Sequence, residues 1–253
     1  MNLKETMRTL KEMGTAQNVK VYRRHGAGTK LYGVSFANLG KLKRQIKVDH
    51  QLAEQLWKSG NTDAMSLAAM IAEPTAFTTS SADRWVKDVR YYLLADLLGG
   101  LIAKSDIALG RYAKWSRSKN EYTKQCGYVV FCSLLKRDPD LVPDEVCEQT
   151  LTTIEKEIHA APNRARHAMN SALISIGIYR HEFRQLAITA AKRIGKVEVD
   201  HGETSCTTPD AIAYIRKGAA HARTKKKTSC GQSQKRPISV DRMPRDCWAA
   251  AGE

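Results

Sequence analysis

Acidic residues are scarce in this sequence. Its 253 residues include 26 Asp and Glu against 41 Lys and Arg, which gives a formal net charge of +15 at pH 7. Residues 221–253 contain eight Lys and Arg and three Asp and Glu, so a charge of +10 remains on the rest of the chain. The body of the protein is therefore itself basic. This charge favours acidic or phosphate-bearing partners, with nucleic acid as the first candidate.

Three other features are missing. The six cysteines contain no close CxxC pair and no spacing typical of secreted domains, which indicates a reducing compartment. The N-terminus lacks a basic-then-apolar signal pattern, and no apolar run approaches the roughly 20 residues that span a bilayer. We therefore expect a soluble, cytoplasmic protein without a membrane partner.

Strand-like alternation is also absent, and apolar residues recur instead at spacings of three and four. Capping residues mark the segments: Ser35 precedes a helix over 36–46, Asp49 one that ends near Gly60, and Thr62 one over 63–73. Further helices are expected over 81–90, up to 103, 107–117, 121–136, 144–159, 164–178, 182–195 and 209–219. Helix pairs at intervals of about 40 residues predict an all-α, HEAT-like helical-repeat α-solenoid, a curved superhelix. An irregular helical domain is the alternative.

The composition changes after Ala220. Residues 1–220 are predicted to form the HEAT-like repeat domain, whereas residues 221–253 are rich in Lys, Arg, Ser and Gln and are predicted to form a basic, disordered tail. A solvated terminus is the simplest role for it, with unspecific attraction to phosphate as the alternative.

The most informative stretch is Trp85 to Asp96. In a helix, Tyr92 and Asp96 lie one turn apart on the same face. A lone carboxylate beside an aromatic ring, in a strongly basic chain, indicates a protein that grips a polyanion and stabilises positive charge on it. For an isolated Asp, the simpler interpretation is a surface or ion-paired acid.

Four stretches occur in an order that resembles the DNA alkylation repair family of AlkD-like DNA glycosylases: Tyr32-Gly33-Val34-Ser35, Leu52 to Gly60 leading into Leu67-Ala68, Trp85 to Asp96, and Ala168 to Gly177. The resemblance covers roughly residues 20 to 220. It implies a HEAT-like solenoid whose concave basic face binds duplex DNA. Active members of that family excise purines alkylated at N3 or N7.

The resemblance places the family's aromatic-x-x-x-Asp motif on Tyr92 and Asp96, as the catalytic residues. An alkylated purine is a cationic leaving group, so one carboxylate that stabilises an oxocarbenium-like sugar and orients water is sufficient chemistry. The family commonly has Trp where Tyr92 stands. An Arg of active members falls on Gln125, with Lys124 as the nearest charge, and a second family aromatic falls on Ser171. These departures put excision in doubt and leave DNA binding untouched.

Basic stripes are expected to contact the DNA backbone. One consists of Arg111, Lys114 and Ser118 with Arg117 at its edge, a second of Arg164, Arg166 and His167, and a third of Lys192, Arg193 and Lys196. With Lys124, Gln125 and Ser171, the residues Arg111, Lys114, Arg117, Arg164 and Arg166 make up the predicted DNA-binding set. Solvated helix faces are the simpler interpretation of each stripe. Since few side chains suggest base-edge readout, binding without sequence preference is expected.

Two other features have structural interpretations. His201, Glu203 and Cys206 do not have a recognised zinc spacing, so we expect a loop followed by a helix start at Thr208, Pro209 and Asp210 rather than a metal site. Trp57 and Trp85 lie in apolar helical stripes and are predicted to be core residues, and packing is also the simpler role for Trp115.

Three functions remain open from the sequence. The first is a monomeric, cofactor-free DNA-binding protein of the alkylation repair family that cleaves the N-glycosidic bond through Asp96. The second is a catalytically inactive relative that binds branched or distorted double-stranded DNA, and Gln125 and Ser171 favour it. The third is a solenoid whose basic face binds an acidic protein.

Overall fold

Helices account for nearly all of the regular structure. The computed structural model describes residues 1–203 and 205–229, and within them it has thirteen α-helices, three short 3-10 helices and no strand. The α-helices are α1 (Leu3–Met13), α2 (Ala16–Arg24), α3 (Phe36–Ile46), α4 (His50–Lys58), α5 (Thr62–Ile71), α6 (Thr79–Asp88), α7 (Tyr92–Ile102), α8 (Ala108–Trp115), α9 (Glu121–Arg137), α10 (Asp144–Glu157), α11 (Asn163–Tyr179), α12 (Arg184–Ile194) and α13 (Ala211–Ser229). The all-α prediction is confirmed. None of the described helices combines the length and apolar character needed to cross a bilayer.

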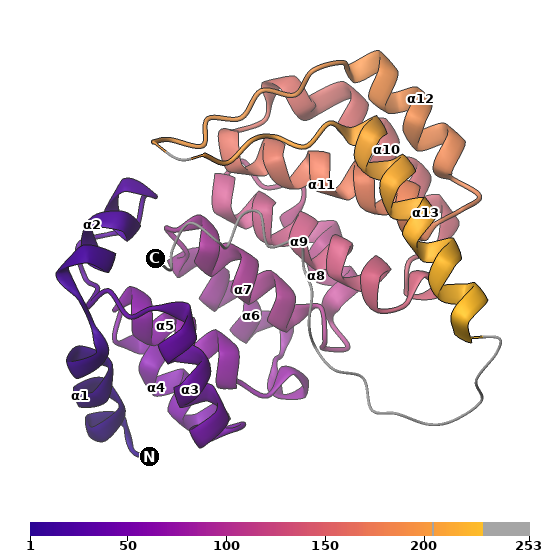
Figure 1. Cartoon of the computed structure of the whole chain (residues 1–253). Coiled ribbons are helices and arrows are strands. Elements are labelled where there is room, and N and C mark those ends of the chain that lie inside the picture. Colours follow the sequence, from indigo (N-terminus) through magenta and orange to yellow (C-terminus); the bar gives the residue numbers. More distant parts are fainter. Residues whose placement is uncertain (204, 230–253) are drawn as a thin grey trace.

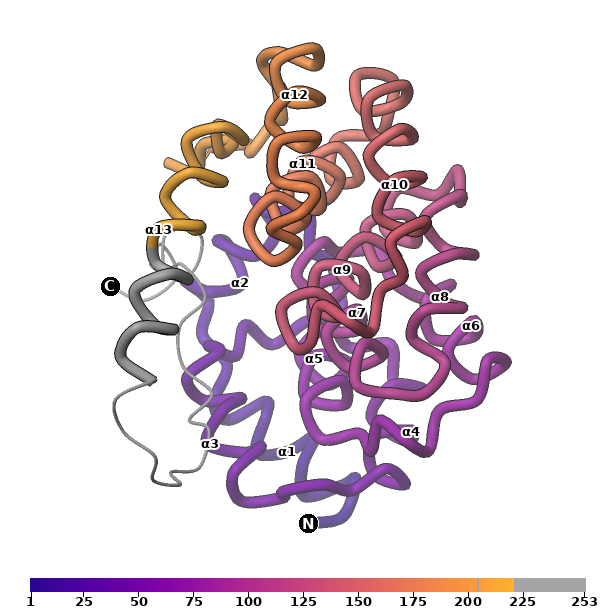
Figure 2. Tube along the Cα trace, turned by 90° about the vertical axis from the view of Figure 1, so that its right-hand side faces the viewer, coloured from indigo at the N-terminus to yellow at the C-terminus, as the bar shows by residue number. Residues whose placement is uncertain are grey.

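The helices stack in two rows that curve together (Figure 1). In the inner row, α3, α5, α7, α9, α11 and α13 each contact the next member. The outer row consists of α4, α6, α8, α10 and α12, which pack against the inner one. Figure 2 shows α4, α6, α8 and α10 along one side of the molecule, with α5, α7 and α9 beside them. This stacking of helix pairs into a curved superhelix confirms the HEAT-like prediction.

The repeat interval differs from the predicted one over the middle of the chain. Helices α5, α7 and α9 begin at residues 62, 92 and 121, which are 30 and 29 residues apart, and only the step to α11 at 163, 42 residues on, matches the predicted 40. The central intervals are shorter because α5, α7 and α8 have only 10, 11 and 8 residues, whereas α9 and α11 have 17 each.

Two helix starts follow the capping residues that the sequence predicted. Ser35 and Asp49 cap α3 and α4 through side-chain oxygens that accept backbone N–H groups. Asn61, one residue before the predicted Thr62, caps α5. At the other end of the chain, α13 runs to Ser229, so residues 221–229 are helical where the sequence predicted disorder. Their Ala, Arg and Lys residues are good helix formers, and no Gly or Pro interrupts them. The remainder of the predicted tail, 230–253, lies outside the described residues.

The predicted tryptophans are core residues. Trp57 and Trp85 are 3% and 1% exposed and stack with ring centroids 4.0 Å apart. Their indole N–H groups donate to Asp88 and Glu54 at 3.0 and 2.9 Å, across 31 residues of sequence in both cases. Trp115 is 2% exposed. Each ring thus fills the space between helix pairs while a carboxylate at the edge satisfies its polar atom.

The Tyr32-Gly33-Val34 stretch has a structural explanation. The buried carboxylate of Asp63, at the start of α5, accepts the backbone N–H groups of all three residues at 2.6 to 3.0 Å. Gly33 has φ +80°, and a Cβ there would lie 2.5 Å from the carbonyl oxygen of Thr15. Only glycine therefore suits this turn, which anchors the segment between α2 and α3 to the inner row.

Candidate nucleic-acid interface

The N-terminal turns of α7, α9 and α11 are tied together by side chains. The Gln125 amide on α9 donates to the backbone oxygen of Tyr92 at 3.0 Å and to Asp96 Oδ1 at 2.7 Å. Glu121, the first residue of α9, accepts the backbone N–H of Arg164 at 2.5 Å. Since Pro162, which precedes α11, provides no side-chain cap, Glu121 satisfies one of the free N–H groups at that helix start. Three helix starts are thereby fixed around Tyr92 and Asp96.

Asp96 is a partly buried carboxyl group held by an amide. It lies one turn after Tyr92, the first residue of α7, and the neighbouring Ala95 and Leu98 face the core. Burial raises the pKa of Asp96 to about 6, although the hydrogen bond from Gln125 and the charge of Arg164 act in the opposite direction. The group is mostly ionised at neutral pH, so a carboxylate is present at the position the motif predicted.

Tyr92 is engaged on both its ring and its hydroxyl group. The guanidinium carbon of Arg164 lies 4.2 Å from the ring centroid, within cation–π range. The hydroxyl group is 3.1 Å from Nδ1 of His25, which follows the end of α2. The family resemblance led us to expect a guanidinium at position 125 of α9, but this position carries the amide of Gln125. Arg164 on α11 instead places a guanidinium at Tyr92.

Arg164 is the cation of this site. Over the residues that the structure describes, its guanidinium forms no ion pair and no side-chain hydrogen bond, and Asp96 acts on it only through the field between them. We call His25, Tyr92, Asp96, Gln125 and Arg164 the Tyr92 site. It combines a stacked cation, an aromatic ring and one carboxylate, which suits a phosphodiester backbone with a cationic or distorted nucleotide beside it.

The predicted basic stripe on α8 lies outside the Tyr92 site. Arg111 and Lys114 share the single carboxylate of Asp83 on α6, at 2.7 and 2.8 Å, so the three side chains together keep one positive charge. Burial works against ionisation of Asp83, but the hydrogen bonds from Lys114, Trp115 and Arg111 hold its pKa below the ordinary value. Arg117 is exposed beyond the end of α8. The residue spacing correctly predicted that Arg111 and Lys114 share a helix face, but it did not predict that Asp83 lies opposite that face.

Three further residues of the predicted set also have other partners. Lys124 is 8% exposed and pairs with Glu157 at 2.9 Å. Arg166 donates to the backbone oxygens of Ala161 and Glu198, and the Ser171 hydroxyl donates to the backbone of its own helix at 3.0 Å. Of the predicted set, only Gln125 and Arg164 contact Tyr92 or Asp96. His25 was missed, because no motif links it to a tyrosine 67 positions away.

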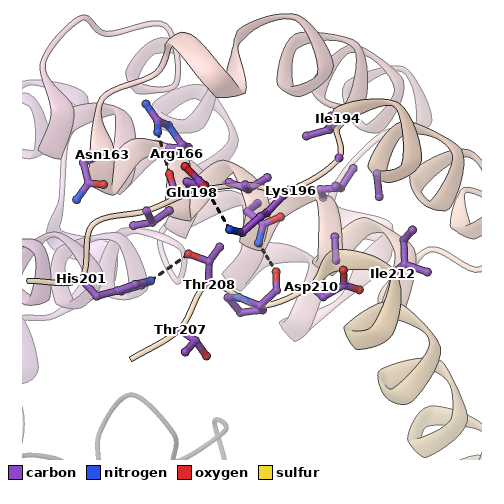
Figure 3. Close-up of a pocket in the computed structure, with 18 of the residues that line it drawn as sticks. Asn163, Arg166, Ile194, Lys196, Glu198, His201, Thr207, Thr208, Asp210 and Ile212 are labelled. Atoms are coloured by element: carbon purple, nitrogen blue, oxygen red, sulfur yellow. Dashed lines mark hydrogen bonds and ion pairs between the residues drawn. The ribbon is translucent and has the colours of Figure 1, made fainter. Parts of the chain in front are cut away.

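The loop before α13 borders a separate cavity. Asp210, rather than Thr208, caps α13 by accepting the N–H of Ala213 at 2.7 Å, while Thr208 pairs with Nε2 of His201 at 3.1 Å. Among the described residues, no three His, Cys, Asp or Glu side chains are grouped so as to hold a metal ion. A cavity of 1150 Å³ separates this loop from α11 and α12, and Figure 3 shows Arg166, Lys196 and Glu198 in its wall. Because Lys196 and Glu198 pair at 2.9 Å, the wall offers a mixture of charges rather than a surface for a polyanion.

The chain is similar to known proteins over most of its length. The family model described as DNA alkylation repair enzyme matches residues 5–215. An uncharacterized protein of Listeria innocua serovar 6a is 32% identical over 214 residues, which covers 82% of this chain and 93% of the relative. One from Listeria monocytogenes serovar 1/2a is 32% identical over 222 residues, covering 85% and 96%.

A solved structure has the same fold. It comes from work on a new family of proteins related to the HEAT-like repeat DNA glycosylases with affinity for branched DNA structures. The two chains superpose with a TM-score of 0.80 at 29% sequence identity, over 88% of this chain and 96% of that one. The similarity therefore extends over nearly the whole helical array.

Proposed function

The chain belongs to the DNA alkylation repair enzyme family, and we propose that it binds double-stranded DNA at the Tyr92 site, with branched or distorted duplexes preferred over regular ones. The observation that carries the proposal is the Arg164 guanidinium, which stacks on Tyr92 near Asp96 and has no paired acid among the described residues. An unneutralised cation in a chain of net charge +15 is suited to a phosphate partner.

The preference for branched or distorted DNA has two supports. The residues that the resemblance associates with excision are altered here, since an uncharged amide stands at Gln125 and no ring at Ser171. The structural relative is described as having affinity for branched DNA. Backbone contacts that track a bent or branched path need no base-edge readout, so binding independent of sequence goes with this function.

Excision of N3- or N7-alkylated purines is the second candidate, and Asp96 favours it. A carboxylate fixed by the Gln125 amide can stabilise the positive charge that develops on the sugar as the glycosidic bond breaks, and it can orient the attacking water. Tyr92 would pack beside the lesion. In this reaction one water is consumed, the alkylated base leaves, and an abasic sugar remains.

Binding is tested by fluorescence anisotropy on a regular duplex and a three-way junction of matched sequence, each over a series of salt concentrations. We expect tighter binding to the junction and a linear fall of log affinity with log salt. Arg164→Gln is expected to reduce that slope by about one, as for the loss of one phosphate contact. Arg84→Gln, an exposed charge on the outer helix α6, is the matched control and is expected to leave the slope unchanged. Affinity without salt dependence would contradict the proposal.

Excision is tested separately, by incubating the protein with a duplex that contains N7-methylguanine and measuring the released base. Release by the intact protein that disappears in Asp96→Asn would establish the glycosylase function. Tight binding without release by the intact protein would leave the binding function and eliminate excision.

A further inference from the structure

Five side chains from four parts of the chain form a continuous row. His25, at the end of α2, contacts Tyr92 on α7, with ring centroids 6.1 Å apart. The guanidinium of Arg164 on α11 lies over the Tyr92 ring, 4.2 Å from its centroid. His167 lies one turn after Arg164 on the same helix, and its ring meets that of His201, in the loop before α13, at 5.6 Å and nearly edge-on. The row joins the end of α2 to the loop before α13 and passes next to Asp96.

From this row we propose a proton-coupled site for one DNA phosphodiester, in which Arg164 binds the phosphate and His25 and His201 take up protons as it binds. The proposal rests on the proposed function, since it specifies which backbone contact that function uses and how the contact responds to pH. Arg164 suits the central position because its planar guanidinium stacks on Tyr92 and has no other described acceptor for its N–H groups.

The hydrogen bonds of the two histidines are compatible with both protonation states. His25 Nδ1 lies 3.1 Å from the Tyr92 hydroxyl, and His201 Nε2 lies 3.1 Å from that of Thr208. A hydroxyl group can donate to a neutral imidazole and accept from a protonated one. Each ring therefore keeps its partner on protonation: the added proton goes to the nitrogen that faces the hydroxyl group, and the ring gains a positive charge that attracts a phosphate.

The surroundings keep these rings neutral when no anion is bound. Burial lowers the pKa of His25, and the charges of Arg164 and Arg24 lower it further. Burial and Arg164 also lower the pKa of His201, with Asp200 opposing them. A phosphate beside Arg164 would reverse these repulsions and favour the imidazolium forms.

Other titratable groups in or beside the row are His167, Asp96, Tyr91, Tyr122 and Glu121, whose carboxylate accepts the backbone N–H of Arg164. Burial raises the pKa of both tyrosines above the ordinary value, so they stay neutral. Burial, followed by the effects of His201 and Arg164, lowers the pKa of His167 to about 4, so this ring stays neutral and acts as a spacer. Asp96 has its pKa near 6, and its protonation in mild acid would also favour an anion. An experiment on this site must therefore separate the histidines from Asp96.

The test measures affinity for the three-way junction at fixed ionic strength between about pH 6 and about pH 8. We expect the intact protein to bind more weakly as the pH rises, by up to about tenfold per pH unit for each proton taken up. The variant with both His25→Gln and His201→Gln should lose most of this dependence. Asp96→Asn should retain it, and so should His181→Gln, an exposed histidine beyond the end of α11. Titration of the histidine ring signals by NMR, with and without the junction, should show His25 and His201 gaining protons in the complex.

The inference would be overturned by a pH dependence in the double histidine variant equal to that of the intact protein, or by its loss in Asp96→Asn alone. Binding that is steeply salt-dependent but independent of pH would also refute it, while leaving the proposed DNA-binding function standing. Failure to bind any of the DNA probes at any pH would instead remove the proposed function itself.

Discussion

Replacing Asp96 by Asn is expected to stabilise the protein above pH 6 and to leave its stability nearly unchanged in acid. The substitution keeps the size of the side chain and the oxygen that accepts the hydrogen bond from Gln125. What it removes is a partly buried charge, whose burial is the main cause of the raised pKa of Asp96. The carboxylate of Asp96 therefore costs folding free energy, as is common for charged groups at active and binding sites.

The magnitude follows from the pKa. A rise from 3.8 in the unfolded chain to about 6 in the folded protein corresponds to about 3 kcal/mol, and partial exposure to solvent reduces this to about 2 kcal/mol. Because the folded pKa is the higher one, the folded state binds the proton more tightly. The penalty is therefore absent below the unfolded pKa, grows between the two values, and is complete above the folded one.

Urea unfolding of the intact protein and of Asp96→Asn measures this directly. The free energy of unfolding of the variant should exceed that of the intact protein by about 2 kcal/mol at about pH 8, and the difference should vanish towards about pH 4. Comparing the two proteins at each pH cancels the titration of all other groups. A variant less stable than the intact protein at pH 8, or a difference that does not change with pH, would refute the argument that burial dominates at Asp96.

The remaining predictions concern the helix array that supports the site. Asp83→Asn should behave in the opposite way to Asp96→Asn: the pKa of Asp83 is lowered, so its contribution to stability is present above the unfolded pKa and is lost as the pH falls through the folded one. Urea unfolding at two pH values should show destabilisation at neutral pH that disappears in acid. Gly127→Ala should lower the free energy of unfolding by about 1 to 3 kcal/mol, because its Cβ would lie 2.6 Å from the backbone nitrogen of Ser116 and force α8 away from α9. An unchanged denaturation midpoint would contradict that close approach.

Local patterns predicted the helices from α3 onward, whereas α1 and α2 were not predicted. Spacings of three and four residues, with capping residues such as Ser35 and Asp49, located most helix starts to within a few residues. The exceptions have local causes as well: Asn61 and Asp210 act as caps in place of neighbouring threonines, and good helix formers extend α13 past Ala220. The interval between repeats was harder to predict, because it depends on helix lengths that differ along the array.

Pairing of charges was not predictable from the sequence. Arg111 and Lys114 have the spacing of a DNA-binding stripe, yet both pair with the one carboxylate of Asp83 on another helix. Lys124 pairs in the same way with Glu157, 33 positions further along. Arg164 has no such acid among the described residues and stacks on Tyr92 instead. Sequence spacing shows which charges share a helix face but not what lies opposite them.

The sequence alone determined a basic, all-α repeat protein and a carboxylate one turn after an aromatic ring, because helix periodicity and capping act over only a few residues. The tertiary structure decided which side chains accompany that pair. His25, Gln125 and Arg164 come from three other helical segments and meet at Tyr92 and Asp96 only because α2, α7, α9 and α11 converge there. Such contacts join residues 29 to 72 positions apart, and they depend on how whole helices pack against one another.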